Sequence, residues 1–155
     1  MIRDPEILDA LLDSVQRFVR QRLVPAENEV AETDHIPEAI VDEMRQLGLF
    51  GLTIPEEYGG LGLTMEEEVR VVMELCKTAP VFRSLIGTTV GIGSQGILMD
   101  GTAEQKQAYL PKLASGEIMA SFALTEPDAG SDAASLRTSA IREGDDYVVN
   151  GTKIW

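Results

Sequence analysis

The residues best suited to chemistry lie in one short segment, FALTEPDAGSD, at positions 122–132. An apolar stretch ends at Thr125, and Pro127 then fixes the direction of the chain. Gly130 permits a positive φ and a close approach of the backbone, and Ser131 adds a hydroxyl donor. Backbone N–H groups and hydroxyls that converge in this way form a nest, which binds an anionic or carbonyl-rich ligand without a cationic side chain. The same residues also fit a tight strand-to-turn connection held by Asp and Ser side-chain hydrogen bonds.

A nest of this kind suits the charge of the chain. The sequence has 155 residues and a formal net charge of −13. Contacts to nucleic-acid phosphates need clustered Lys and Arg side chains, so this balance argues against a nucleic-acid partner. Any phosphate-bearing ligand must therefore be held by backbone N–H groups, hydroxyls and a few local bases.

A second motif, GIGSQG at residues 91–96, matches the G-x-G-x-x-G fingerprint of dinucleotide-binding proteins. Glu117 follows roughly 20 residues later, where that fingerprint places a ribose-binding acid. The motif lies inside a helical pattern rather than between a strand and a helix, so its context argues against a nicotinamide cofactor. Its small residues suit close helix packing; alternatively, Gly87, Gly91 and Gly96 leave room for an apolar ligand.

The other reactive residue types carry no assignable chemistry. His35 is the only histidine and Cys76 the only cysteine, so neither a metal site nor an internal disulfide is expected. We expect His35 to be exposed in a connector and Cys76 to be buried on an apolar helix face. The lone cysteine favours a cytoplasmic protein, and no apolar run reaches the roughly 18 residues that would indicate a membrane span.

The elements that position these segments begin with two helices and a loop. Apolar spacing predicts one helix over residues 5–28, which Pro25 should kink or end, and a second over residues 37–47, which Gly48 stops. Residues 48–64 are rich in Gly and Pro and should form an ordered loop.

Further helices are expected after this loop. The first begins at a capping box formed by Thr64 and Glu67 and should bury one apolar face. The side chains expected on that face are Val69, Val72, Met73 and Cys76. A weaker helical run covers residues 81–99. A last helix begins at a second capping box at Thr102, and Pro111 should divide it.

After Gly116 the apolar period changes to alternation, which is typical of strands. Strands are predicted at residues 118–125, 136–141 and 147–155, with a hairpin turn at Gly144-Asp145. The predicted fold class is therefore mainly α.

We expect two domains: an all-α domain over residues 1–117, then the first strands of an incomplete β domain over residues 118–155. Because two or three strands cannot bury both faces of a sheet, the sequence is expected to be part of a larger protein.

The segment ALTEPDAGSD resembles the signature of the acyl-CoA dehydrogenases, FAD enzymes that introduce a double bond between Cα and Cβ of an acyl-CoA thioester. The segments RFVRQRLVPAENEV, GLFGLTIPEEYGGLGLT, GTAEQKQAYLPKLASGE and VVNGTKIW also resemble family segments, in the family's order. The resemblance covers nearly the whole chain. It implies an N-terminal helical domain, a middle β domain and a C-terminal four-helix domain.

The resemblance also implies which residues bind FAD. They are Phe122, Leu124, Thr125, Gly130, Ser131 and Trp155. Leu124 and Thr125 are expected near the pyrimidine end of the flavin, and Trp155 against the isoalloxazine. Gly130 and Ser131 are expected where the diphosphate and the CoA arm pass, which makes Ser131 a substrate-binding residue as well.

In the family, a carboxylate from the C-terminal domain removes the α-proton and the flavin accepts the β-hydride. No acid of this chain is assigned that role, so the 155 residues alone are expected to be inactive. Glu126 and Asp132 are expected to hold the shape of the loop, because acids near a diphosphate repel it.

The implied partners are an acyl-CoA substrate, an electron-transfer flavoprotein as electron acceptor, and further copies of the parent chain in a homotetramer. Residues 81–99 are expected to line the pocket for the acyl tail. An acyl-CoA oxidase or a flavin-dependent monooxygenase would share these modules and remains an alternative. A non-catalytic helical scaffold that keeps the signature only as structure is another.

Overall fold

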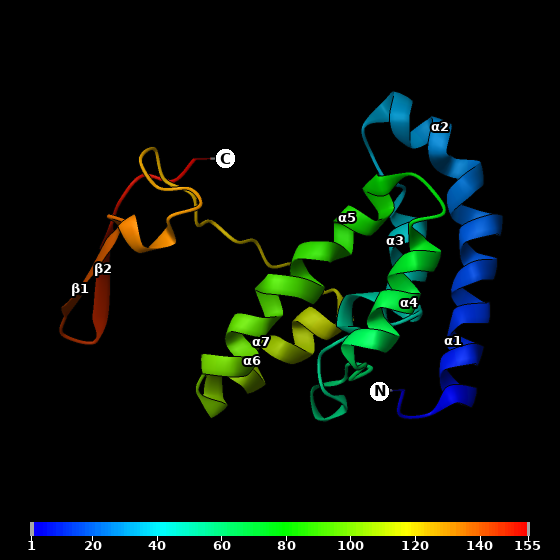
Figure 1. The fold of residues 1–155 in the computed structure, drawn as a ribbon, viewed down its shortest axis with the longest axis horizontal. Helices are drawn as coiled ribbons and strands as arrows, with labels where there is room; N and C mark the ends of the chain where they lie inside the picture. Colours follow the sequence, from blue (N-terminus) through cyan, green and yellow to red (C-terminus); the bar gives the residue numbers. More distant parts are fainter. Residues whose placement is uncertain (1, 155) are drawn as a thin grey trace. The chain divides into compact units, whose positions relative to one another are not determined.

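The structure is a computed structural model that describes residues 2–154. The chain divides into two compact units, Met1–Ser121 and Phe122–Trp155, called here the helical unit and the hairpin unit (Figure 1). The α-helices of the helical unit are α1 (Pro5–Phe18), α2 (Val24–Thr33), α3 (Glu38–Gln46), α4 (Met65–Leu75), α5 (Pro80–Thr88), α6 (Ser94–Asp100) and α7 (Ala103–Ser115). The hairpin unit contains β1 (Ser139–Glu143) and β2 (Asp146–Asn150). The mainly α prediction is confirmed.

Shorter helical turns connect these elements. They are the π-helical turns η1 (Val19–Leu23) and η4 (Thr89–Gly93) and the 3-10 turns η2 (Leu49–Gly51), η3 (Glu56–Tyr58) and η5 (Ala133–Ser135). Among residues 2–154, no helix has the length and hydrophobicity needed to cross a lipid bilayer.

The first helical stretch continues through Pro25. α1 passes into η1 and then into α2, which has Pro25 in its first turn and ends at Thr33. A π-helical turn is wider than an α-helical one, so it relieves the clash between the proline ring and the carbonyl one turn earlier. The helix therefore extends beyond its predicted end, and Asp34 stops it in a left-handed conformation with φ 54°.

The core of the helical unit is mainly aliphatic. The apolar spacing that predicts the second helix places Ile40, Val41, Met44 and Leu47 on one face; the first three, in α3, are buried in the core and Leu47 is half-buried. The large apolar side chains of α1 and η1 are also buried or half-buried, apart from Ile7, which is 67% exposed. The predicted stop at Gly48 is confirmed by its φ of 71°, a left-handed conformation that favours glycine.

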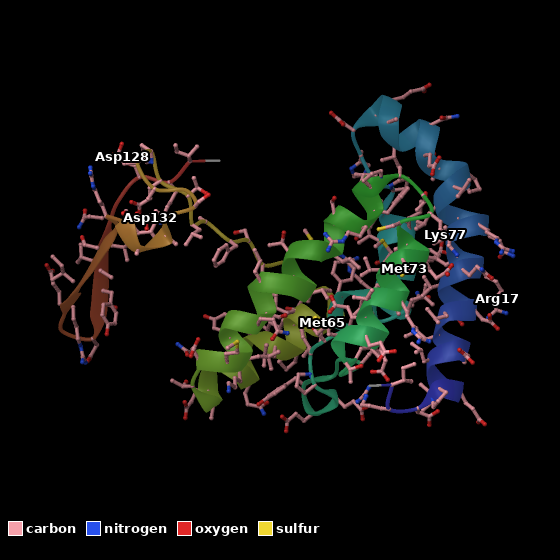
Figure 2. All side chains as sticks on the ribbon, in the orientation of Figure 1. Arg17, Met65, Met73, Lys77, Asp128 and Asp132 are labelled. Carbon is pink, nitrogen blue, oxygen red and sulfur yellow. The ribbon has the colours of Figure 1, made fainter. Side chains whose placement is uncertain are left out.

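α4 buries a different face from the predicted one. Its buried side chains are Glu67, Val71 and Leu75. Val69 is 49% exposed and Cys76 is also exposed, and Met73, labelled in Figure 2, is 63% exposed, so their predicted burial is wrong; Val72 is half-buried.

Glu67, in the first turn of α4, explains why the helix buries this face. Glu67 forms the predicted capping box with Thr64, and its carboxylate also accepts a hydrogen bond from the backbone N–H of Arg3 at 2.8 Å. These donors draw the acid inward, and the residues four and eight positions later then face the core with it.

α7 begins at the predicted capping box of Thr102 and Gln105 but is not divided at Pro111. Leu110 and Leu113, on either side of the proline, are 0% and 2% exposed. Burial of these two side chains stabilises the turn despite the missing N–H of the proline, so the predicted division is wrong.

In the hairpin unit β1 pairs with β2 in antiparallel register, from Ser139 opposite Asn150 to Glu143 opposite Asp146. Gly144 in the connecting turn has φ 67°, which confirms the predicted hairpin. Residues 118–125 are extended but are not a strand, so that prediction is wrong. A strand needs a ladder of bonds to a neighbour, and among the described residues this segment shows one such bond, from Ile154 N–H to Thr125 O.

Candidate functional site

The signature segment folds into a tight turn closed by its own backbone. The N–H of Glu126 donates to the carbonyl of Ala129 at 2.9 Å, and the N–H of Ala129 donates back at 3.2 Å. Ala129 is buried, whereas Gly130 and Ser131 immediately after it are exposed. The turn therefore presents the glycine and the serine to solvent.

A buried carboxylate holds this turn. The Glu126 oxygens accept hydrogen bonds from the backbone N–H groups of Arg137 at 2.7 Å and Thr138 at 3.0 Å, and from the Thr138 hydroxyl. Lys153 Nζ donates to the same carboxylate at 3.0 Å. The Thr138 hydroxyl, followed by the Arg137 amide and Lys153, lowers the pKa of Glu126 from 4.5 to about 2. The prediction that Glu126 shapes the loop is confirmed.

The segment before the turn is tied to the chain near residue 153. Lys153 Nζ donates to the carbonyl of Leu124 at 2.9 Å, and the N–H of Ile154 donates to the carbonyl of Thr125 at 2.9 Å. The side chains of Phe122 and Leu124 are 54% and 36% exposed, and Thr125 is half-buried. Leu124 and Thr125 are thus held by their backbone carbonyls, while the side chains of Phe122 and Leu124 remain accessible.

Gly130 and Ser131 have unused donors. Neither makes a hydrogen bond to any of the described residues. The positive φ that Gly130 permits is not used, and a Cβ added there would meet no described heavy atom within 4 Å. Gly130 and Ser131 therefore keep an open approach and free backbone N–H groups, while the convergence of these groups on one anion stays a prediction.

The polar side chains around the turn bond to one another within the hairpin unit. The Arg137 guanidinium pairs with Asp128 at 2.8 Å on the exposed side of the turn. Asp132 accepts a hydrogen bond from the Ser135 hydroxyl at 2.5 Å, so it holds the next turn, as predicted (Figure 2). An anionic ligand at this turn would therefore rely on backbone and hydroxyl donors.

The GIGSQG segment lies in η4 and α6, within a helical run that kinks at Gly91 (φ −81°, ψ −108°). It does not connect a strand to a helix, so the predicted helical context of the motif is confirmed. A Cβ added at Gly93 would lie 2.3 Å from the Ala120 Cβ, which shows close packing against an extended segment. A Cβ at Gly91 or Gly96 would meet no described atom within 4 Å, so these two positions are open.

The kink has its own polar support. The Val90 carbonyl, within the π turn, accepts hydrogen bonds from the Thr53 hydroxyl at 2.9 Å and the Ser94 hydroxyl at 3.3 Å. The buried Thr89 hydroxyl accepts a hydrogen bond from the N–H of Ala120 at 3.1 Å. Such π turns are frequent at functional sites.

Two features escaped the sequence argument. One is Lys153, which was seen only as part of a strand, and whose partner Glu126 lies 27 positions away. The other is an apolar hollow of about 390 Å³ in the helical unit, between the start of α1 and the loop before α4. Its apolar lining is Ile7, Leu8, Leu11, Leu61 and Leu63. The hollow is lined by two segments that are far apart in the sequence, so no local pattern indicates that they meet.

The predicted exposure of His35 is confirmed. Two other predictions are not tested by these observations. Trp155 lies outside the described residues, so its stacking on a flavin stays a prediction. The domain boundary after residue 117 also stays a prediction.

Comparison with known families matches both units. The sequence model described as "Acyl-CoA dehydrogenase, N-terminal domain" matches residues 5–117. The model described as "Acyl-CoA dehydrogenase, middle domain" matches residues 121–155.

Individual relatives agree with these matches. The chain is 45% identical over 151 residues to (2S)-methylsuccinyl-CoA dehydrogenase of Cereibacter sphaeroides, covering 97% of this chain and 27% of that protein. A solved glutaryl-coenzyme A dehydrogenase in complex with glutaryl-CoA has a TM-score of 0.88 and 34% identity, covering 100% of this chain and 40% of that one. An acyl-CoA dehydrogenase of Bacillus anthracis complexed with FAD has a TM-score of 0.83 and 33% identity, covering 99% and 28%. The chain thus spans well under half the length of these relatives.

Proposed function

Because the chain belongs to the acyl-CoA dehydrogenase family, we propose that the intact protein uses FAD to dehydrogenate an acyl-CoA thioester between its Cα and Cβ. The observation that carries this proposal is the signature turn itself. Glu126 and Asp132 accept hydrogen bonds from other residues of the hairpin unit, while the N–H groups of Gly130 and Ser131 remain free to donate to a ligand. The solved FAD complex of a relative supports the choice of cofactor.

The residues of the turn fit such a cofactor. The exposed side chains of Phe122 and Leu124 offer apolar contact to an aromatic ring. The N–H groups of Gly130 and Ser131 offer donors to a diphosphate, and the Ser131 hydroxyl offers a further donor to the diphosphate or to the CoA arm. When bound, FAD supplies the acceptor for the β-hydride.

The chain's own contribution is therefore binding and orientation. We assign removal of the α-proton to a carboxylate outside these 155 residues, so the chain alone is proposed to be inactive. Residues 81–99 are proposed to line the pocket for the acyl tail, because the open positions at Gly91 and Gly96 leave space beside an apolar helix. An electron-transfer flavoprotein is proposed as the electron acceptor, with a cytoplasmic homotetramer as the working form.

The test is anaerobic titration of the intact purified protein with acyl-CoA thioesters. We expect a yellow flavin spectrum that bleaches on addition of substrate and recovers with an electron-transfer flavoprotein. A protein that stays colourless after incubation with FAD would contradict the proposal and favour a scaffold. Rapid reoxidation of the reduced flavin by oxygen would favour the oxidase. Turnover that requires both oxygen and a second reductant would favour the monooxygenase.

A further inference from the structure

We propose that Glu126 and Lys153 form a positioning pair that sets the affinity and environment of the bound cofactor, although neither side chain contacts it. This inference rests on the proposed function, because it concerns the same site. It concerns how the site is held in shape, which the family comparison leaves open.

The pair joins three segments of the hairpin unit at one point. Lys153 Nζ lies 2.9 Å from the Leu124 carbonyl and 3.0 Å from a Glu126 oxygen. The same carboxylate accepts hydrogen bonds from the backbone N–H groups of Arg137 and Thr138, the two residues just before β1. The Glu126 side chain is only 6% exposed and that of Lys153 is 28% exposed. The turn, the approach to β1 and the segment after β2 therefore share one ionic centre.

The geometry directs one backbone donor outward. The C=O and N–H groups of one peptide plane point in opposite directions because the plane is trans. The bond from Lys153 to the Leu124 carbonyl therefore directs the Thr125 N–H to the opposite side. That N–H donates to none of the described residues. Lys153 thus fixes a free donor at the position proposed to lie near the flavin.

The charges explain why the pair would act indirectly. The Glu126 carboxylate already accepts four hydrogen bonds, and a bare carboxylate beside a diphosphate would repel it. Lys153 neutralises this buried charge, which would be costly if left unpaired. The centre can therefore hold the turn without opposing an anionic ligand.

The same turn offers a matched control. Asp128 forms an ion pair with Arg137 at 2.8 Å, but the two side chains are 66% and 78% exposed. Replacing Asp128 by Asn also removes one negative charge from the turn. It leaves the bonds to Leu124 and to Glu126 in place.

The experiment measures FAD binding to the intact protein and to four variants: Glu126→Gln, Lys153→Met, Lys153→Arg and Asp128→Asn. Gln keeps the size of the acid but turns an amide N–H₂ toward N–H donors. We expect Glu126→Gln and Lys153→Met to weaken FAD binding about 10- to 100-fold, as an unsatisfied buried polar group does. The visible absorption and circular dichroism of the bound flavin should also shift at saturation. The FAD affinity of Asp128→Asn should stay within about twofold of wild type. Lys153→Arg should bind FAD with most of the affinity that Lys153→Met loses.

The outcomes separate this inference from the proposed function. If wild-type protein does not bind FAD, both fall. If wild type binds FAD and Glu126→Gln and Lys153→Met bind it equally well, only the positioning pair is overturned. A weaker affinity with an unchanged flavin spectrum at saturation would also overturn it, because that result indicates general loss of stability. If Glu126→Gln does not fold, the contrast between Lys153→Met and Lys153→Arg decides.

Discussion

The helical unit and the hairpin unit are held together by different forces. The helical unit buries many aliphatic side chains, including Leu23, Met44 and Leu75, each 0% exposed. Among the described residues of the hairpin unit, only Ala129 and Glu126 are buried. A carboxylate with backbone and lysine donors thus takes the place of an apolar core. The shape of the signature turn therefore depends on hydrogen bonds and charge more than on packing.

The largest effect is expected from the apolar core of the helical unit. Leu75→Ala should lower the free energy of unfolding by about 2–5 kcal/mol, because it removes a fully buried side chain of α4. Met73→Ala, on the exposed face of the same helix, should change it by about 0.5 kcal/mol or less. Denaturant unfolding followed by helical circular dichroism measures both. Equal losses in the two variants would show that the face of α4 is assigned wrongly.

A smaller loss is expected where each unit depends on a left-handed glycine. Gly116 has φ 72°, and an added Cβ would lie 2.9 Å from the Phe50 ring, so Gly116→Ala should cost about 2 kcal/mol. Gly144 has φ 67° and open space around it, so Gly144→Ala should cost only about 1 kcal/mol and act on the hairpin. Unfolding of the helices and amide exchange in β1 and β2 report the two effects separately. A helical unit destabilised by Gly144→Ala would contradict the division into units.

Acid should loosen the hairpin unit before the helical unit. The pKa of Glu126 is lowered from 4.5 to about 2, so the folded form binds fewer protons than the unfolded form between these values. The stability that Glu126 contributes is therefore present above about pH 4.5 and is lost as the pH falls toward 2. The rate of hydrogen exchange at the Arg137 and Thr138 amides, corrected for its intrinsic pH dependence, should therefore rise as the pH falls from about 4.5 toward 2.

Two comparisons make the pH experiment decisive. Glu126→Gln should remove the pH-dependent step at these amides. Glu67 in the helical unit also has a pKa lowered to about 2, chiefly by the backbone N–H of Arg3, but its helix is also held by the buried apolar side chains of Val71 and Leu75. Amides of α4 should therefore stay protected where those bound to Glu126 do not. Simultaneous loss of protection in both units would contradict the contrast between them.

The smallest effect is expected from the exposed ion pair of the turn. Asp128→Asn should change the free energy of unfolding by about 0.5 kcal/mol or less, because an exposed pair is screened by water and salt. Amide exchange in the hairpin unit with and without added salt measures this. A loss comparable to that of Glu126→Gln would show that surface charge, rather than the buried carboxylate, holds the turn.

Local signals predicted much of the fold. The capping boxes at Thr64 and Thr102, the stop at Gly48 and the hairpin turn at Gly144 were all identified from residues within a few positions of each other. Each depends on a side chain or conformation that only a few residue types supply. The structural role of Glu126 was also predicted, from the repulsion between an acid and a diphosphate.

Long-range contacts account for most of what was missed. The bond between Arg3 and Glu67 spans 64 positions and turns α4 to a face that apolar spacing did not indicate. Burial of Leu110 and Leu113 keeps α7 intact across a proline. Lys153 was overlooked because nothing in its neighbourhood indicates the partner. In the candidate site, the exposed donors were therefore predictable and the pair that positions them was not.

The central claim is that backbone N–H groups and a hydroxyl, rather than cationic side chains, hold the cofactor's diphosphate at the signature turn. A crystal structure of the intact protein with FAD tests it most directly. The account predicts diphosphate oxygens within hydrogen-bond distance of the Gly130 and Ser131 donors, with Glu126 and Lys153 still bonded to each other. A diphosphate bound instead by arginine or lysine side chains, or located away from this turn, would contradict it.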